Sequence, residues 1–232
     1  MAKKEVGKKL ETPLYAHDKP KSITSEKFRG IRSNIMFSGA NEEIKSIIIT
    51  SEKPAAGKSI ISANIAISYA QAGFKTLIID GDMRKPTQQY NFETANYDGL
   101  SNLIIGKSDF DKAIRSTRVE NLDLLTSGPV PPNPSELVAS DRFKEIYNQL
   151  MDMYDFILID TPPVTSVTDA QVFLQLVKDC VMIIDTEKNN KNEIKKAKQL
   201  IEQADGHIIG AVLNKTERDK SSNYYNYYGD ED

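Results

Sequence analysis

The sequence predicts an α/β fold with a doubly wound, mainly parallel sheet flanked by helices. Six short apolar runs lie at 45–50, 75–80, 122–126, 155–160, 180–185 and 207–213. They are continuous rather than alternating, which is typical of strands buried on both faces. Helix-length segments at 58–72, 135–153, 168–178 and 189–204 lie between them. This alternation of strand and helix predicts ligand binding beyond the carboxyl ends of the strands.

Composition limits the classes of protein that the chain can be. Its 232 residues are 39% hydrophobic, enough for one domain with a sizeable core, and the net charge of −3 gives no basic field, so we expect no nucleic-acid partner. The single cysteine, Cys180, lies in the apolar run "CVMIID", where we expect a buried hydrophobic role and no disulfide. No apolar run approaches the roughly 18 residues of a membrane span, and we expect a cytoplasmic protein.

The segment "SEKPAAGKSI", residues 51–60, follows the first predicted strand. It fits the phosphate-binding pattern G-x-x-x-x-G-K-[ST], except that Glu52 takes the place of the first glycine. The next helix begins with unpaired N–H groups and the positive end of its dipole, both of which favour an anion. Lys58 can reach the phosphates and the Ser59 hydroxyl can ligate Mg²⁺. An ordinary strand–turn–helix is the alternative interpretation.

Aspartates follow two other predicted strands. Asp80 ends the strand at 75–80, Asp82 comes just beyond it, and Asp160 ends the strand at 155–160. Carboxylates that converge beside a phosphate loop repel one another unless a cation lies among them, and Mg²⁺ with oxygen ligands is the natural cation. Singly, each aspartate could merely cap a turn. Together with G-K-S they predict a metal–nucleotide site.

The proline-rich segment "GPVPPNPSEL" forms no regular element before Ser135. We expect the Ser135 side chain to be the N-cap of the helix that begins there. The segment is interpreted as a rigid connection without chemistry of its own.

Several motifs together resemble the bacterial tyrosine kinases. They are "EKFRGIR" (26–32), the phosphate loop, "DGDMRKP" (80–86), "SGPVPPNPSELV" (127–138), "DTPPV" (160–164) and "YYNYY" (224–228). The resemblance covers nearly the whole chain. It implies a P-loop NTPase fold of the MinD/ParA-like, deviant Walker type, and an ATP- and Mg²⁺-dependent protein-tyrosine kinase unrelated to the eukaryotic kinases.

The resemblance also implies roles for the site residues. Lys58 and Ser59 hold the phosphates and Mg²⁺, while Asp82 and Asp160 position the metal and its waters. Asp80 is the expected base for a tyrosine hydroxyl, although Asp80 and Asp82 could exchange roles. The nucleotide-binding residues are expected to be Lys53, Pro54, Ala55, Ala56, Gly57, Lys58, Ser59 and Ile60, with Asn214 at the position that contacts the base in related P-loop proteins.

Three loop residues leave alternatives open. Ala55 stands where the family usually has glycine, and a left-handed conformation there would cost about 1–2 kcal/mol. Ile60 replaces a second hydroxyl. Nucleotide binding is expected to survive these departures, whereas a binding-competent scaffold with impaired catalysis is the alternative. Lys53 is either a solvated charge or the extra lysine of MinD/ParA-type ATPases.

The predicted organisation is an N-terminal arm (1–21), a kinase domain (22–217) and a flexible tyrosine-rich tail (218–232). The domain opens with a helix over 22–38, whose apolar stripe, Phe28, Ile31 and Ile35, should face the core. A charged row, Glu26, Arg29 and Arg32, runs along the flank of this helix. It is either a solvated face or, as the resemblance implies, a subunit contact in a ring, typically of eight subunits.

The tail carries Tyr224, Tyr225, Tyr227 and Tyr228, and its sequence has no helical or strand period. It is interpreted as an aromatic binding patch or, by resemblance, as the acceptor of phosphate in trans. The resemblance further implies a membrane activator with a cytoplasmic tail, recruitment to the inner face of the membrane, and protein substrates in capsular or exopolysaccharide synthesis. A MinD/ParA-like ATPase switch is the second hypothesis, but it leaves the tail and the charged row without a role.

Overall fold

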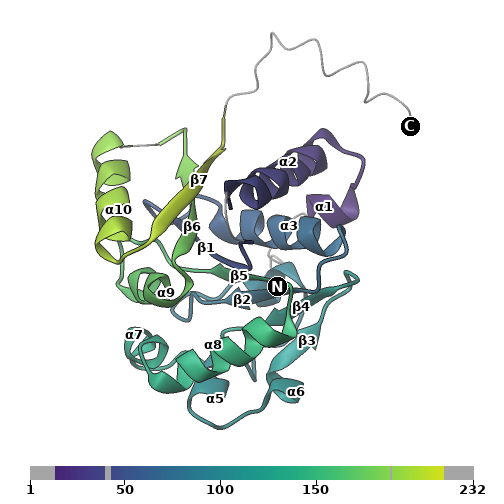
Figure 1. Ribbon diagram of the computed structural model, residues 1–232, viewed down its shortest axis with the longest axis vertical. Helices are drawn as coiled ribbons and strands as arrows, with labels where there is room; N and C mark the ends of the chain where they lie inside the picture. The colour runs from purple at the N-terminus through teal and green to yellow at the C-terminus, as the bar shows by residue number, and fades with distance from the viewer. Residues whose placement is uncertain (1–13, 40–42, 189, 217–232) are drawn as a thin grey trace, which may run out of the picture.

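A computed structural model describes residues 14–39, 43–188 and 190–216, and these form a seven-stranded sheet of order β3-β4-β2-β5-β1-β6-β7 (Figure 1). The six predicted strands are confirmed and run parallel: β1 (Ser46–Ser51), β2 (Thr76–Asp80), β4 (Leu122–Leu125), β5 (Phe156–Asp160), β6 (Asp179–Asp185) and β7 (His207–Asn214). An antiparallel edge strand, β3 (Ile114–Ser116), was not predicted, because three partly polar residues give no periodic signal.

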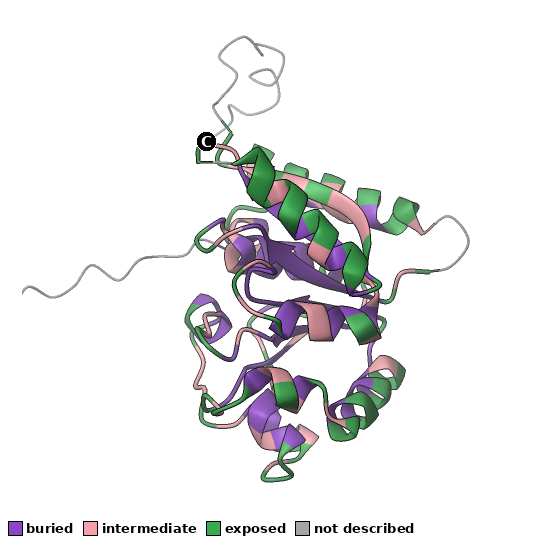
Figure 2. Ribbon diagram, turned by 90° about the vertical axis from the view of Figure 1, so that its left-hand side faces the viewer, coloured by how far each residue is buried: buried purple, intermediate pink, exposed green. Residues whose placement is uncertain are grey.

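Helices cover both faces of the sheet. One face carries α1 (Tyr15–Asp18), α2 (Ile23–Ser38) and α3 (Lys58–Ala70). The other carries α5 (Leu100–Ile104), α6 (Phe110–Ala113), α7 (Pro134–Val138), α8 (Asp141–Met153), α9 (Asp169–Val177) and α10 (Lys191–Gln203), while α4 (Gln88–Asn91) follows β2. Figure 2 shows the buried strands between two layers of helices whose outer sides are exposed. The prediction of a doubly wound sheet is therefore confirmed.

Successive side chains of the central strands pack alternately into the two cores, one on each face of the sheet. In β1, Ile47 and Ile49 pack toward α3, whereas Ile48 packs against the core of α8 and α9. This double burial explains why the sequence shows continuous rather than alternating apolar runs. Cys180 of β6 is fully buried, as predicted, and burial raises the pKa of its thiol to about 12.

The predicted helix over 135–153 is two helices, α7 and α8. The break falls at Ala139 and Ser140, and the Ser140 side chain caps α8 by accepting a hydrogen bond from the Phe143 N–H at 3.3 Å. The expectation that Ser135 caps α7 is wrong. Asn133 precedes the helix and Pro134 occupies its first turn, where a missing N–H does no harm.

The first described residues belong to the packed domain. Leu14 and Ala16 are buried in the core around α3. The Ala16 N–H donates to Asn64 Oδ1 at 2.9 Å, and Gln71 Nε2 donates to the Ala16 carbonyl at 2.8 Å. The backbone of α1 is thereby fixed to α3 by two long-range hydrogen bonds.

Helix α2 confirms the predicted apolar stripe, with Phe28 and Ile35 buried. The two arginines of the charged row point in different directions. Arg29 pairs with Glu26 at 2.5 Å on the outer side, whereas Arg32 turns inward and its Nη1 donates to the Ser68 carbonyl at 2.6 Å, in the last turn of α3. Arg32 therefore joins two helices, and only the Glu26–Arg29 pair lies on the outer face. No helix of the described ranges is long and apolar enough to cross a bilayer.

We expect Arg32→Ala to lower the free energy of unfolding by about 1–3 kcal/mol, because the Ser68 carbonyl loses a charged donor and the arginine stem leaves a gap. Urea unfolding at neutral pH measures this change. Arg29→Ala, which removes the ion pair with Glu26 and a hydrogen bond to the Pro20 carbonyl near the surface, is the control and should have a smaller effect. Equal losses of unfolding free energy in the two variants would contradict the conclusion that Arg32, rather than Arg29, supports the packing of α2 on α3.

Candidate functional site

The phosphate-loop pattern lies between β1 and α3. Gly57 precedes α3 with a φ of 96°, and a Cβ at this position would lie 2.2 Å from Asn214 Nδ2. Glycine is therefore required for two reasons, backbone conformation and contact with the end of β7. Helix α3 begins at Lys58, so its free N–H groups and its positive dipole end open at the carboxyl edge of the sheet.

Glu52, which replaces the usual first glycine, is buried beneath this loop. Its Oε1 accepts a hydrogen bond from the Asp185 N–H at 3.4 Å, and its carbonyl accepts one from the Thr165 hydroxyl. Its Oε2 has no partner in the part of the chain that the structure describes. The side chain therefore ties the loop to β6, and the loop closes without a glycine at this position.

Two buried carboxylates stand side by side where β2 and β5 end. Asp80 pairs with Asp160 in the sheet register, and both are fully buried. Burial and the neighbouring charge of Asp160 raise the pKa of Asp80 well above its ordinary value. Burial also raises the pKa of Asp160, against the opposing effects of the Lys58 charge and of hydrogen bonds with Ser59 and Gln88. A cation at this edge would relieve the repulsion.

Asp80 and Asp82 differ in access. Asp80 accepts hydrogen bonds from the N–H groups of Thr87 and Gln88, each at 2.9 Å, and from that of Asp82 at 3.2 Å. Its two oxygens are thus used to hold the segment that follows β2. Asp82 instead lines a cavity, and burial raises the pKa of its carboxyl against the Lys85 N–H and the Lys58 charge.

This cavity has a volume of about 500 Å³ and brings together most of the predicted site. Its walls combine the phosphate loop, the segment after β2 and the segment after β5. The lining residues are Pro54, Ala55, Gly57, Lys58, Ser59, Ile60, Asp82, Arg84, Lys85, Thr87, Asn91, Pro162, Pro163, Ser166 and Val167. No three His, Cys, Asp or Glu side chains of the described ranges are grouped closely enough to hold a metal ion by themselves.

Gln88 is a site residue that the sequence analysis missed. Its Nε2 donates to Asp160 Oδ2 at 2.8 Å and to the Ser59 carbonyl at 3.0 Å, and its own N–H donates to Asp80. One buried amide thus connects the phosphate loop with both strand-end carboxylates. A single glutamine in a polar segment carries no pattern that would have indicated this role.

The proline-rich segment is also part of the site. Arg84 forms a bidentate pair with the buried Asp169, at 2.9 Å for both contacts, and the Ser135 hydroxyl donates to the same carboxylate at 2.6 Å. The segment after β2 is thereby fixed to α7 and α9. The interpretation of Ser135 and its neighbours as a plain connection missed this contact.

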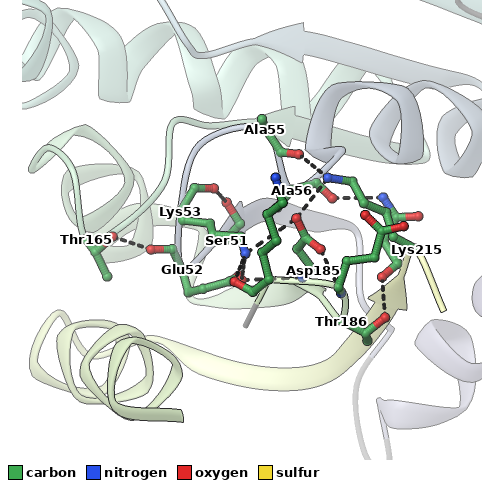
Figure 3. Close-up of polar contacts among 12 residues, drawn as sticks. Ser51, Glu52, Lys53, Ala55, Ala56, Thr165, Asp185, Thr186 and Lys215 are labelled. Carbon is green, nitrogen blue, oxygen red and sulfur yellow. Dashed lines mark hydrogen bonds and ion pairs between the residues drawn. The ribbon is translucent and has the colours of Figure 1, made fainter. Parts of the chain in front are cut away.

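Lys53, Ala55 and Ala56 lie with Asp185 and Lys215 where the loop faces the ends of β6 and β7 (Figure 3). Lys53 is not a solvated charge: its ammonium contacts the Lys188 carbonyl and lies 3.4 Å from Asp185. Ala55 has a φ of 59°, so the left-handed conformation considered above is present. Asn214 Nδ2 donates to the Ala56 carbonyl at 2.8 Å. The four tail tyrosines, Tyr224, Tyr225, Tyr227 and Tyr228, lie outside the described residues.

A phosphate loop, an open helix N-terminus, a cavity lined by Asp82 and a buried pair of strand-end aspartates define a P-loop protein of the α/β class. A family model described as an AAA domain matches residues 44–209. The chain is 65% identical to CapB of Staphylococcus aureus over 231 residues, 100% of both chains. It is 38% identical to the tyrosine-protein kinase YwqD of Bacillus subtilis over 230 residues, 99% of this chain and 97% of the other.

Solved structures agree with the sequence relatives. The chimerical protein CapA2B2 superposes with a TM-score of 0.86 at 54% identity, covering 88% of this chain and 90% of that one. A MinD protein of Pyrococcus horikoshii shares the fold, with a TM-score of 0.64 at 24% identity over 76% of this chain and 72% of that one. The chain belongs to the bacterial tyrosine-kinase family of P-loop proteins, as the sequence motifs predicted.

The buried carboxylates predict a pH dependence of stability. Because the folded state holds the pKa of Asp160 above its unfolded value, folding takes up protons above about pH 3.8, and stability falls as pH rises toward the folded pKa. We expect the stability of Asp160→Asn, whose amide can still contact Gln88 and Ser62, to fall less steeply with rising pH than that of wild type. Urea unfolding of nucleotide-free protein between pH 4 and 8 measures the slopes. If the stabilities of wild type and Asp160→Asn fall equally steeply with pH, Asp160 is not the source of the pH dependence.

Proposed function

We propose that this chain is an ATP- and Mg²⁺-dependent protein-tyrosine autokinase that transfers the γ-phosphoryl group to its C-terminal tyrosine cluster. The observation that carries the proposal is the convergence of Lys58, Ser59 and Asp82 on one cavity at the N-terminus of α3. Membership in the bacterial tyrosine-kinase family supports the same reaction.

The residues present fit Mg·ATP. The loop and the start of α3 offer N–H groups to phosphate oxygens, and Lys58 adds a charge that lies near the Asp160 carboxylate. Mg²⁺ neutralises phosphate charge, and it commonly keeps waters and needs only one or two carboxylates. Ser59, Asp82 and Asp160 would hold the ion and its waters. The raised pKa values of the aspartates describe a site that favours added positive charge.

The two aspartates of the "DGDMRKP" segment divide the work. We assign Asp82 the contacts with the metal and the tyrosine hydroxyl, because it lines the cavity. Asp80 accepts three backbone hydrogen bonds, from Asp82, Thr87 and Gln88. We therefore choose the exchange of roles that the sequence analysis left open and propose that Asp80 is a positioning residue. The reaction depends more on positioning and charge stabilisation than on a strong base.

The acceptors are Tyr224, Tyr225, Tyr227 and Tyr228, and transfer takes place between subunits of a ring. The exposed Glu26–Arg29 pair of α2 supports a subunit contact, since it is available on the outer face. Resemblance supports a membrane activator with a cytoplasmic tail, and the solved chimera CapA2B2 is a second support for such a component. The kinase then acts at the inner face of the membrane on protein substrates of capsular or exopolysaccharide synthesis.

The ATPase switch and the weak scaffold have less support. A MinD/ParA-like switch would use Lys53 across a dimer, whereas Lys53 here contacts Glu52, Asp185 and the Lys188 carbonyl of its own chain. A scaffold would follow if Ala55 and Ile60 prevented turnover. A phosphotyrosine assay with Mg·ATP and the activator's cytoplasmic segment distinguishes the three functions.

The decisive experiment mixes two variants. Tyr224→Phe/Tyr225→Phe/Tyr227→Phe/Tyr228→Phe keeps the cavity but lacks acceptors, and Lys58→Met keeps acceptors but loses at least roughly 100-fold in rate. We expect phosphate to appear on the Lys58→Met chain in the mixture, measured by phosphotyrosine blotting of chains of different length. Each variant alone is the control. An unlabelled mixture, with wild type active, would rule out transfer between chains.

Assembly is tested with Glu26→Ala/Arg29→Ala. Both side chains lie at the surface of α2, where Arg29 also donates to the Pro20 carbonyl. The variant should therefore unfold at a slightly lower urea concentration than wild type but show a smaller mass by light scattering. Phosphorylation at low protein concentration should fall with the mass. Arg32 is left intact because it supports α3. An unchanged mass would show that the outer face of α2 is exposed to solvent and makes no subunit contact.

A further inference from the structure

Four charged residues lie together on the side of the phosphate loop that faces the ends of β6 and β7: Glu52, Lys53, Asp185 and Lys215, here called the Asp185 cluster (Figure 3). Asp185 ends β6, and Lys215 follows directly after β7. The Asp185 carboxylate lies 2.8 Å from the Lys215 ammonium and 3.4 Å from that of Lys53, with only 3% of its side chain exposed. The hydrogen bond from Lys215 lowers the pKa of Asp185 to about 2, so the carboxylate stays charged.

The cluster reaches the loop through Lys215. Its Nζ donates to the Ala55 carbonyl at 3.0 Å, and the neighbouring Asn214 Nδ2 donates to the Ala56 carbonyl at 2.8 Å. In a trans peptide the next N–H points opposite to the carbonyl. These two contacts therefore turn the N–H groups of Ala56 and Gly57 away from the end of β7. Within the described ranges, neither of these N–H groups has an acceptor.

The loop needs such support because its backbone is strained. Ala55 has a φ of 59°, which an L-residue other than glycine rarely adopts. A return of Ala55 to negative φ would rotate its carbonyl and with it the N–H of Ala56. Lys215 binds the carbonyl of the strained residue itself, and Asp185 fixes the position of the ammonium.

We propose that Lys215, anchored by Asp185, is a positioning residue of the nucleotide site: it holds the Ala55 carbonyl so that the loop N–H groups of Ala56 and Gly57 stay directed at phosphate oxygens. The inference rests on the proposed nucleotide binding at this loop. It gives the end of β7 a role in phosphate binding, in addition to any contact of Asn214 with the base.

The role predicts energetic coupling between residues 55 and 215. Lys215→Met should weaken the binding of Mg·ADP about tenfold, because the strained loop loses its support. In an Ala55→Gly background the same substitution should weaken binding no more than about threefold, since glycine adopts the left-handed conformation without strain. Titration calorimetry of the full chain measures the four affinities, and urea unfolding shows that each variant is folded.

The matched control is Lys178→Met. Lys178 is also an ion-paired lysine with positive φ, but it pairs with Asp205 at the opposite end of β6. Its substitution should leave Mg·ADP affinity unchanged. Lys215→Arg keeps a donor for the carbonyl and the carboxylate and should retain most of the affinity, which covers the case in which Lys215→Met does not fold.

Two results would overturn the inference. If wild type binds Mg·ADP and Lys215→Met binds it equally well, Lys215 does not position the loop. If Lys215→Met causes the same loss in the wild-type and in the Ala55→Gly background, Lys215 acts elsewhere and not through the strained residue. Failure of the wild type itself to bind Mg·ADP would instead contradict the proposed function.

Discussion

The pairing of two buried carboxylates at the ends of neighbouring strands is the constraint on which the site depends. Asp80 and Asp160 are neighbours in the register of β2 and β5, and neither reaches solvent. Buried like charges are tolerated only with several donors, and the surrounding structure supplies them from Gln88, Ser62 and the backbone of the segment after β2. These hydrogen bonds fix the backbone of the segment after β2, and that backbone sets the position of Asp82 and Arg84 in the cavity wall.

The side of the phosphate loop that faces β6 and β7 carries opposite charges rather than like ones. Glu52 follows β1 and Asp185 ends β6, and the two lysines that neutralise them come from the loop and from the residue after β7. The loop thus lies between an acid pair that attracts cations and an ion-paired group that is already neutralised. We assign the proposed nucleotide chemistry to the first side and the proposed conformational support to the second.

The strands could be predicted from sequence because burial on both faces leaves an unbroken apolar run, and the strand-end aspartates followed from the parallel sheet. Individual side-chain directions could not be predicted. Arg29 and Arg32 occupy the same row, yet one points outward and the other contacts α3 because the Ser68 carbonyl lies nearby in the last turn of that helix. Gln88 and Ser135 likewise act through partners distant in the chain, Asp160 and Asp169, and local propensity contains no information on such partners.

Helix α3 has no free side along most of its length, since sheet, α1 and α2 enclose it. A close-packed helix of this kind cannot shift without opening the core. Any widening of the cavity must therefore come from the loop segments of its wall, 54–57, 82–91 and 162–167. Asp80 and Asp169 hold the segment 82–91 through several hydrogen bonds. The segment 162–167 has fewer side-chain hydrogen bonds, at Pro162 and Thr165, so it can shift with a smaller loss of contacts than 82–91.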